Sequence, residues 1–411
     1  MKLFIGIDVS STDLETVMIS SEDNEIIFQG KFANDITGAS EIKDQILKLA
    51  QPARFDQIVI GMESTSIYSF HPAFFFKNDA ELAKFNVQVV VINPRQTKRY
   101  HDIFEDNKND HIDAFYIADY LRVGRYTVGI VRQENYSALQ RLTRTRYELT
   151  QSLVRAKQHF LHNLYYKANN LAIGKQKTSV FGATMMDLLI EDMTLDEIVN
   201  TPTEALADYL SHKGRGRFAD PQGLTKDIQK AVRSSYRLGK VMNDSVDTVL
   251  AVYAKEIKTF QKMIKELDDA IAQIVDVIPE EQILQSIPGI GPVYAAGIIA
   301  EIGQIDRFED ETKLAKYAGL TWKQNQSGKF ESTTTPLLRT GDSYLRYYLI
   351  EAANRVRRED SVFKEYYSRK YQEVQRTPTK RALVLTARKL IRVIFYLLKN
   401  HQIYKPKEWL V

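Results

Sequence analysis

The chain has 411 residues, a formal net charge of +4 and no cysteine. This length is too great for one ordinary hydrophobic core and predicts two or three domains. A hydrophobic content of 44% with 26% charged residues is typical of a globular protein, and no apolar run approaches the roughly 18 residues that a membrane span needs. The lack of cysteine excludes disulfides, thiolate metal sites and a cysteine nucleophile, and we expect a cytoplasmic protein without a membrane partner.

The N-terminal part of the chain predicts an α/β domain. We expect strands over residues 2–9, 14–20, 25–32, 57–63 and 87–92, and helices over residues 40–49 and 68–82. Acidic residues stand at the ends of the first and fourth strands, Asp8 and Glu63. This order of elements, with acids at these two places, is the ribonuclease-H arrangement.

A third predicted helix, over residues 108–121, begins with two further acids. Asp110 and Asp113 are three residues apart and therefore share one helix face. Four carboxylates would then converge from two strand ends and one helix start, which suits a hard cation such as Mg²⁺ or Mn²⁺ in phosphoryl transfer. The alternative is that Asp110 and Asp113 only stabilise the positive end of the helix dipole.

Residues 131–278 predict a long helical arm. Leucine and phenylalanine recur at helical spacing over residues 134–167, and the pattern resumes over residues 246–277, as expected for a second helix antiparallel to the first. Such an arm favours self-association through a coiled coil or a helical bundle. Glycine and proline divide the intervening residues 168–237, which we expect to form an irregular insertion.

Two segments are strongly basic although the whole chain is not. Residues 141–167 hold six Lys or Arg against one acid, and residues 369–399 hold nine against one. Tyrosine, phenylalanine or histidine is interleaved in both segments. Together they favour binding to a polyanion such as nucleic acid, although either segment alone is equally typical of a solvated helix surface.

Residues 279–411 predict a mostly α-helical domain with two motifs. The turn Ile-Pro-Gly-Ile-Gly-Pro over residues 287–292 resembles a helix-hairpin-helix, in which Gly289 and Gly291 would present backbone N–H groups to a phosphate. The alternative is that these glycines only permit close helix packing. Further on, Ser327 stands in a polar stretch among cations, where it would serve as a nucleophile or, more simply, form a turn.

These motifs together resemble the insertion-sequence transposases that join an N-terminal RuvC-like DEDD domain to a C-terminal transposase domain, which are described as bridge-RNA-guided DNA recombinases. The resemblance covers residues 1 to about 355 and is carried, in order, by GIDVS, GMES, KNDHIDA, IPGIGPVYAAGIIAEIG, KYAGLTWKQNQSGK and TGDSYLRYYLIEAA. It implies a RuvC-like domain over residues 1–130, the helical arm over 131–278 and a transposase domain over 279–411.

The resemblance also assigns roles. It implies that Asp8, Glu63, Asp110 and Asp113 bind a divalent metal and that Ser327 links covalently to a DNA end. The partners it implies are double-stranded donor and target DNA, a structured guide RNA, and further copies of the chain in a dimer or tetramer. The residues that we expect to contact nucleic acid are Gly289, Gly291, Lys329, Arg339 and Arg346.

Three other functions remain open from the sequence. A metal-dependent junction-resolving nuclease would use the four carboxylates and water, without a covalent serine intermediate. An actin-like or sugar kinase would use the turn after Asp8 to hold phosphate, but the later glycine-rich phosphate loop and the adenosine loop of such enzymes are not found. A nucleic-acid scaffold without catalytic activity is the third.

Overall fold

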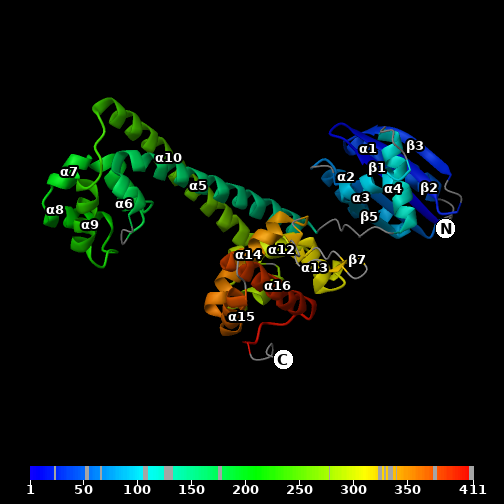
Figure 1. Cartoon of the computed structure of the whole chain (residues 1–411). Helices are drawn as coiled ribbons and strands as arrows, with labels where there is room; N and C mark the ends of the chain where they lie inside the picture. The colour runs from blue at the N-terminus through cyan, green and yellow to red at the C-terminus, as the bar shows by residue number, and fades with distance from the viewer. Residues whose placement is uncertain are drawn as a thin grey trace. The chain divides into compact units, whose positions relative to one another are not determined.

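The computed structural model describes residues 1–22, 25–50, 55–64, 67–104, 110–124, 133–174, 178–276, 278–322, 326–327, 330–331, 337–338, 340–373 and 377–406. The chain divides into two compact units, Met1–Gln133 and Glu134–Val411 (Figure 1). Within the described ranges, no helix is long and apolar enough to cross a membrane.

The first unit is built on one five-stranded sheet. Its strands are β1 (Lys2–Val9), β2 (Asp13–Ser20), β3 (Ile26–Ala33), β4 (Gln57–Glu63) and β5 (Val87–Ile92). They lie in the order β3-β2-β1-β4-β5, with β1 antiparallel to β2 and parallel to β4. All five predicted strands are confirmed to within a residue or so at their ends, and this mixed sheet is consistent with the ribonuclease-H-like fold.

Helices cover both faces of this sheet. They are α1 (Ile36–Ala50), α2 (Phe70–Asn78), the short 3₁₀ helix η1 (Leu82–Phe85), α3 (Pro94–His101) and α4 (Asp110–Val123). Helices α1 and α2 share a buried core with one face, and α4 packs on the other. Pro94 is the first residue of α3, a position where proline is well tolerated.

The helix predicted over residues 68–82 is wrong in its extent. Helix α2 ends at Asn78 because Asp79 adopts an extended backbone conformation. The Asp79 carboxylate accepts hydrogen bonds from the backbone N–H groups of Glu81 and Leu82, which starts η1 instead. Aspartate competes in this way with helix continuation because its short side chain reaches nearby backbone donors.

Two glycines of the sheet allow α4 to approach it closely. Gly6 of β1 and Gly61 of β4 are register partners. A Cβ atom on Gly6 would lie 2.1 Å from the carbonyl oxygen of Ala114 and 2.5 Å from the backbone nitrogen of Ala118, and one on Gly61 would lie 2.5 Å from Leu121 Cδ1. The backbone of α4 therefore occupies the space of the missing Gly6 side chain, and this contact fixes the helix against β1.

We expect Gly6→Ala to destabilise the first unit by about 1–3 kcal/mol or more, because the new methyl group meets rigid helix backbone rather than a movable side chain. Urea unfolding of the full chain, followed by intrinsic fluorescence and circular dichroism, measures the change. The matched control is Gly30→Ala in β3, whose Cβ would meet only the rings of Phe28 and Phe32 at 3.0–3.2 Å. Equal stability of the two variants would contradict the close packing of α4.

The second unit is almost entirely helical. Its helices are α5 (Glu134–Ile173), α6 (Ala183–Asp187), the π-helical turn η2 (Leu188–Asp192), α7 (Leu195–Asn200), α8 (Thr203–Lys213), α9 (Pro221–Arg233), α10 (Lys240–Val275), α11 (Glu280–Gln285), α12 (Pro292–Ile302), η3 (Ile305–Arg307), α13 (Glu311–Tyr317), α14 (Ser343–Glu359), α15 (Ser361–Glu373) and α16 (Pro378–Lys399). The predicted combination of an α/β part and a helical part is confirmed. The predicted domain boundary at residue 279 stays a prediction, because the arm and the C-terminal helices belong to this one unit.

Helices α5 and α10 form the expected antiparallel pair. They lie side by side in Figure 1, and ion pairs join Arg146 to Asp268 near one end and Lys167 to Asp247 near the other. Helix α5 continues past the predicted end at residue 167, with a kink at Ala168, where the backbone leaves helical geometry. The two helices thus build the predicted arm.

The insertion predicted as irregular over residues 168–237 is instead folded. It forms α6 to α9, which share a buried core with α5 and α10 through residues such as Leu206, Leu210 and Ile228. The glycines and prolines that suggested irregularity stand at helix ends: Pro221 is the first residue of α9, and Gly214 caps α8. Such residues are compatible with helix termini.

Candidate functional site

Two of the expected acids lie at one edge of the sheet on the same face. Side chains alternate between faces along a strand. In β1, the residue Phe4 packs in the core beneath α4 and Gly6 contacts α4, so Asp8 follows on that face. In β4 the same alternation puts Glu63 on it, two residues after Gly61. Because β1 and β4 are parallel neighbours, both carboxylates stand at adjacent strand ends.

Side chains of helix α3 contact both Glu63 and a third acid, Asp113 of α4. The Thr97 hydroxyl donates a hydrogen bond to Oε1 of Glu63, and Nε2 of His101 lies 3.6 Å from Oδ1 of Asp113. Thr97 and His101 are four residues apart and share one face of α3. Glu63 and Asp113 therefore contact the same face of one short helix. Asp110 is the first residue of α4, and its side chain lies outside the described residues.

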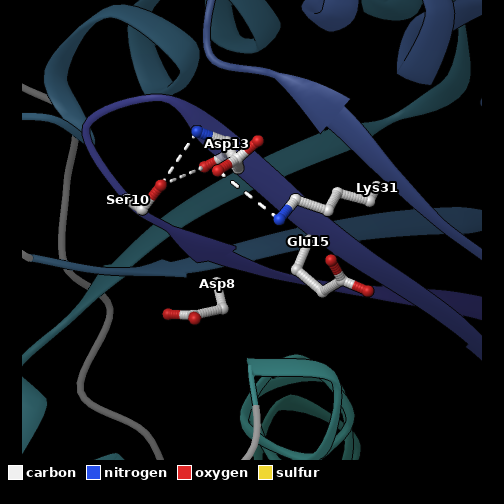
Figure 2. A pocket seen from close by; sticks show the side chains of 5 residues that line it. All are labelled: Asp8, Ser10, Asp13, Glu15 and Lys31. Carbon is white, nitrogen blue, oxygen red and sulfur yellow. Dashed lines mark hydrogen bonds and ion pairs between the residues drawn. The ribbon is translucent and has the colours of Figure 1, made fainter.

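The turn after Asp8 is closed by its own hydrogen bonds. Ser10 Oγ accepts hydrogen bonds from the backbone N–H groups of Thr12 and Asp13, at 3.2 and 2.8 Å, and Asp13 pairs with Lys31 (Figure 2). These contacts use the Ser10 hydroxyl to shape the β1–β2 turn. In this turn, which suggested a kinase-like phosphate site, the Thr12 and Asp13 N–H groups thus bind the Ser10 hydroxyl.

A further carboxylate, that of Glu15, lies beside Asp8 on the neighbouring strand β2. Glu15 of β2 is its register partner, and both line a small hollow with Ser10, Asp13 and Lys31 (Figure 2). Like charges directly opposite one another in antiparallel strands destabilise a sheet. Lys31, the register partner of Glu15 on β3, supplies a positive charge to the same hollow.

The acids at this edge have the donor atoms of a divalent-metal site. Aspartate and glutamate oxygens are the ligands that Mg²⁺ and Mn²⁺ prefer, and Asp8, Glu63 and Asp113 all stand at the same edge of the unit. Among the described side chains, however, no three acidic or histidine groups gather closely enough to hold an ion. The chemistry of the residues fits a metal, and the expected set is complete only with Asp110.

Sequence reasoning did not find Thr97, His101 or Glu15. Thr97 and His101 were missed because no element was predicted between the strand that ends at residue 92 and the helix that begins at residue 108. The available signal was a proline at a helix start followed by polar residues at i and i+4. Glu15 had the weaker signal of a strand acid paired with Asp8, which only the register reveals.

In the second unit, the glycine turn between α11 and α12 is tightly packed on one side. Gly289 has a φ of 95°, and a Cβ atom there would lie 2.8 Å from the backbone nitrogen of Val356 in α14. Close packing therefore accounts for Gly289. Gly291 precedes α12 as its N-cap, and a Cβ atom there would meet nothing within 4 Å. A role of either glycine in phosphate binding stays a prediction.

Ser327 ends a very short strand. It belongs to β7 (Gln326–Ser327), which pairs with β8 (Phe330–Glu331), and the Ser327 side chain lies outside the described residues. Lys329 and Arg339 also lie outside them. Arg346 of α14 donates a hydrogen bond to the carbonyl oxygen of Ala318, at 3.3 Å, so part of its hydrogen-bonding capacity serves the packing of α14 on α13.

The strands on either side of this hairpin, β6 (Thr321–Trp322) and β9 (Leu337–Leu338), pair with each other, so Trp322 and Leu337 lie next to each other. The return point of this segment is tightly packed, because a Cβ atom on Gly341 would lie 2.2 Å from the carbonyl oxygen of Tyr317. The next residue, Asp342, accepts a hydrogen bond from the Leu345 N–H and begins α14. Asp342 thus has a structural role at the base of the Ser327 segment.

A buried ion pair supports the same base. Glu301 of α12 is fully buried, and Arg144 of α5 binds it through Nε at 2.7 Å and through Nη2 at 2.8 Å. Arg144 also lies 3.3 Å from Asp342. Burial alone would lower the pKa of the Arg144 guanidinium, but its hydrogen bonds and charge interaction with Glu301 raise that pKa above its ordinary value. The pair ties the arm to the C-terminal helices.

The order of the mixed sheet is consistent with a ribonuclease-H-like fold for the first unit. A transposase profile for the DEDD domain of IS110-type elements matches residues 5–166, and a profile described as transposase IS116/IS110/IS902 family matches residues 281–368. The first match contains all four expected metal ligands, and the second contains Ser327. The chain belongs to the IS110/IS116 family of transposases.

Individual relatives agree with the two profiles. The 44.8 kDa protein of insertion element IS116 from Streptomyces clavuligerus is 24% identical, over 98% of this chain and 96% of its own length. A probable family 20 transposase from Pseudomonas aeruginosa is 30% identical over 37% of this chain and 45% of its own length. The transposase of insertion element IS1111A from Coxiella burnetii is 26% identical, over 53% and 58%.

We expect Arg144→Met to lower the free energy of unfolding by about 3 kcal/mol, because the buried Glu301 carboxylate loses its opposite charge and keeps the hydrogen bond from Gln140. The double variant Arg144→Met/Glu301→Leu should recover most of this loss, since it removes both charges. Arg155→Met, an exposed position on the same helix, is the control and should change stability by less than about 0.5 kcal/mol. Urea unfolding measures all three, and a double variant less stable than Arg144→Met would contradict the interpretation.

Proposed function

We propose that the protein is a DNA recombinase that cuts and rejoins strands through a composite site of four carboxylates and one serine. The carboxylates are Asp8, Glu63, Asp110 and Asp113, and the nucleophile is Ser327. The observation that carries the proposal is the placement of Asp8 and Glu63 at adjacent strand ends on the α4 face, with Asp113 next to the same helix α3 as Glu63. Family membership supports DNA as the substrate.

The chemistry requires both parts of the site. Ser327 Oγ forms a bond to the phosphorus of a DNA strand, the bond from phosphorus to the leaving sugar oxygen breaks, and the serine proton passes to that oxygen. Rejoining reverses these steps with a sugar hydroxyl from another strand, which releases the serine. A divalent ion held by the carboxylates would stabilise the charge on the phosphate oxygens. Each step forms one ester bond to phosphorus and breaks another, so the number of these bonds stays constant.

Recognition of particular DNA sequences is assigned to a structured guide RNA, as the family resemblance implies. The chain contains no zinc finger, since it has no cysteine, and its basic segments suit contacts to phosphate backbones, which hold nucleic acid without reading its sequence. Base pairing between RNA and DNA would then supply specificity. An assembly of two or four copies would allow two DNA sites to be held at once.

The serine and carboxylate roles are separated by two variants. With Mg²⁺, guide RNA and labelled DNA ends, we expect wild type to give a covalent protein–DNA adduct on denaturing gels and joined products. Ser327→Ala should give neither, while Asp8→Asn should lower both by more than about 100-fold, since even losing a residue behind a metal ligand costs about 10–100-fold.

Ser343→Ala is the matched control for the serine, because Ser343 is the exposed first residue of α14, and it should behave as wild type. An adduct that survives in Ser327→Ala would contradict the nucleophile. Metal-dependent cleavage by wild type without any adduct would favour the junction-resolving nuclease instead.

The guide is tested by recovering the nucleic acid that copurifies with the protein from cells carrying its gene and the flanking DNA. We expect sequencing to return one discrete RNA that matches the flanking DNA. The control is an unrelated basic protein purified at the same salt concentration, because phosphate contacts depend strongly on salt. Recovery of only the mixed cellular RNA that the control also binds would contradict an RNA-guided mechanism.

A further inference from the structure

We infer that α3 is a positioning helix for the carboxylate site, with Thr97 and His101 as positioning residues that orient Glu63 and Asp113. This inference rests on the proposed metal site and extends it to residues outside the four acids. Its basis is that two side chains on one face of α3 reach two of the proposed ligands, which come from different elements of the sheet domain.

Thr97 is placed to hold Glu63 in one orientation. Its side chain is 3% exposed, and its hydroxyl has one proton, for which Oε1 of Glu63 and the carbonyl oxygen of Pro94 are both within hydrogen-bond distance. A bond to a carboxylate is the stronger choice, because hydrogen bonds to charged groups exceed those to neutral ones. With one oxygen directed to Thr97, the carboxylate of Glu63 is fixed in its rotation.

His101 faces Asp113 in the same manner. Its Nε2 atom is buried and has no hydrogen-bond partner among the described residues, while Oδ1 of Asp113 lies 3.6 Å away. Its ring contacts the ring of Tyr116 edge to face, with centroids 4.8 Å apart. A buried polar nitrogen is costly when unpaired, so a small movement of Asp113 toward His101 is favoured when that carboxylate takes up its ligand position.

The rest of α3 is held firmly enough to serve this role. Tyr100 donates a hydrogen bond of 2.5 Å to Asp119 of α4, and Arg122 binds the other oxygen of that carboxylate at 2.9 Å. Asp119 is buried, and burial together with this hydrogen bond raises the pKa of the Tyr100 phenol. Tyr100 lies between Thr97 and His101 in the sequence of α3. Its hydrogen bond to Asp119 therefore fixes α3 to α4, the helix that carries Asp113.

This arrangement explains how acids from separate elements become one site. Residues behind metal ligands orient them, and their loss typically weakens metal binding by about 10–100-fold. Glu63 belongs to β4 and Asp113 to α4, and side chains of α3 contact both. Its position directly after β5 makes the last strand of the sheet part of the site.

The test is a Mn²⁺ titration of the full-length chain followed by electron paramagnetic resonance, which needs neither DNA nor turnover. We expect Thr97→Val and His101→Phe, which preserve shape but remove the polar atoms, to weaken Mn²⁺ binding by about 10–100-fold. Thr97→Ser and His101→Gln restore a hydroxyl and a side-chain N–H, so they should bind within about threefold of wild type.

Thr16→Val is the matched control. Thr16 is a fully buried threonine of β2, and its hydroxyl has no hydrogen-bond partner among the described residues. Its register partner is Ile7, on the sheet face away from α4. This variant should leave Mn²⁺ binding unchanged. Circular dichroism of every variant verifies folding, and the serine and glutamine rescues keep the test decisive should Thr97→Val fail to fold.

Asp8→Asn separates failure of the inference from failure of the proposed function. If Asp8→Asn loses Mn²⁺ binding while Thr97→Val and His101→Phe bind as wild type does, the positioning role of α3 is wrong and the metal site stands. If Asp8→Asn binds Mn²⁺ as tightly as wild type, the proposed metal site is wrong and the inference falls with it.

Discussion

The contact between Gly6 and the backbone of α4 is the constraint on which the first unit depends. A helix can lie this close to a sheet only where a strand offers no side chain, and Gly6 and Gly61 provide two such places side by side in neighbouring parallel strands. The positions of two of the acids follow from this contact. Asp8 is two residues beyond Gly6, and Asp113 immediately precedes the Ala114 that touches Gly6, so a packing requirement also brings charged groups to one edge.

The second unit depends on a different kind of contact. Here the arm and the C-terminal helices are joined through a buried charge, Glu301, which the paired guanidinium of Arg144 and a hydrogen bond from Gln140 stabilise. The sequence motif TGDSYLR has a structural explanation at the same place, since Gly341 packs on α13 and Asp342 begins α14. These residues pack at the base of the segment that carries Ser327, whose chemical role is a proposal.

The family motifs thus divide into two groups with different physical roles. Gly289 and Gly341 are required because helix or loop backbone occupies the space of a side chain. For Asp8, Glu63, Asp113 and Ser327, the account offered is the proposed chemistry. Residues 168–237 show a related difference: their prolines and glycines stand at helix ends of a folded insertion, although in the sequence they resemble interruptions.

The sequence by itself determined the strands, the long helix pair and the four acids with their order along the chain, because strand and helix periodicity and the ends of apolar runs are local properties. It did not reveal α3 or the meeting of Thr97 with Glu63 and of His101 with Asp113. Those contacts join residues 34 and 12 positions apart, and no periodicity encodes them. The tertiary structure decided them, because the position of α3 depends on how β5 pairs with β4 and how closely α4 approaches the sheet.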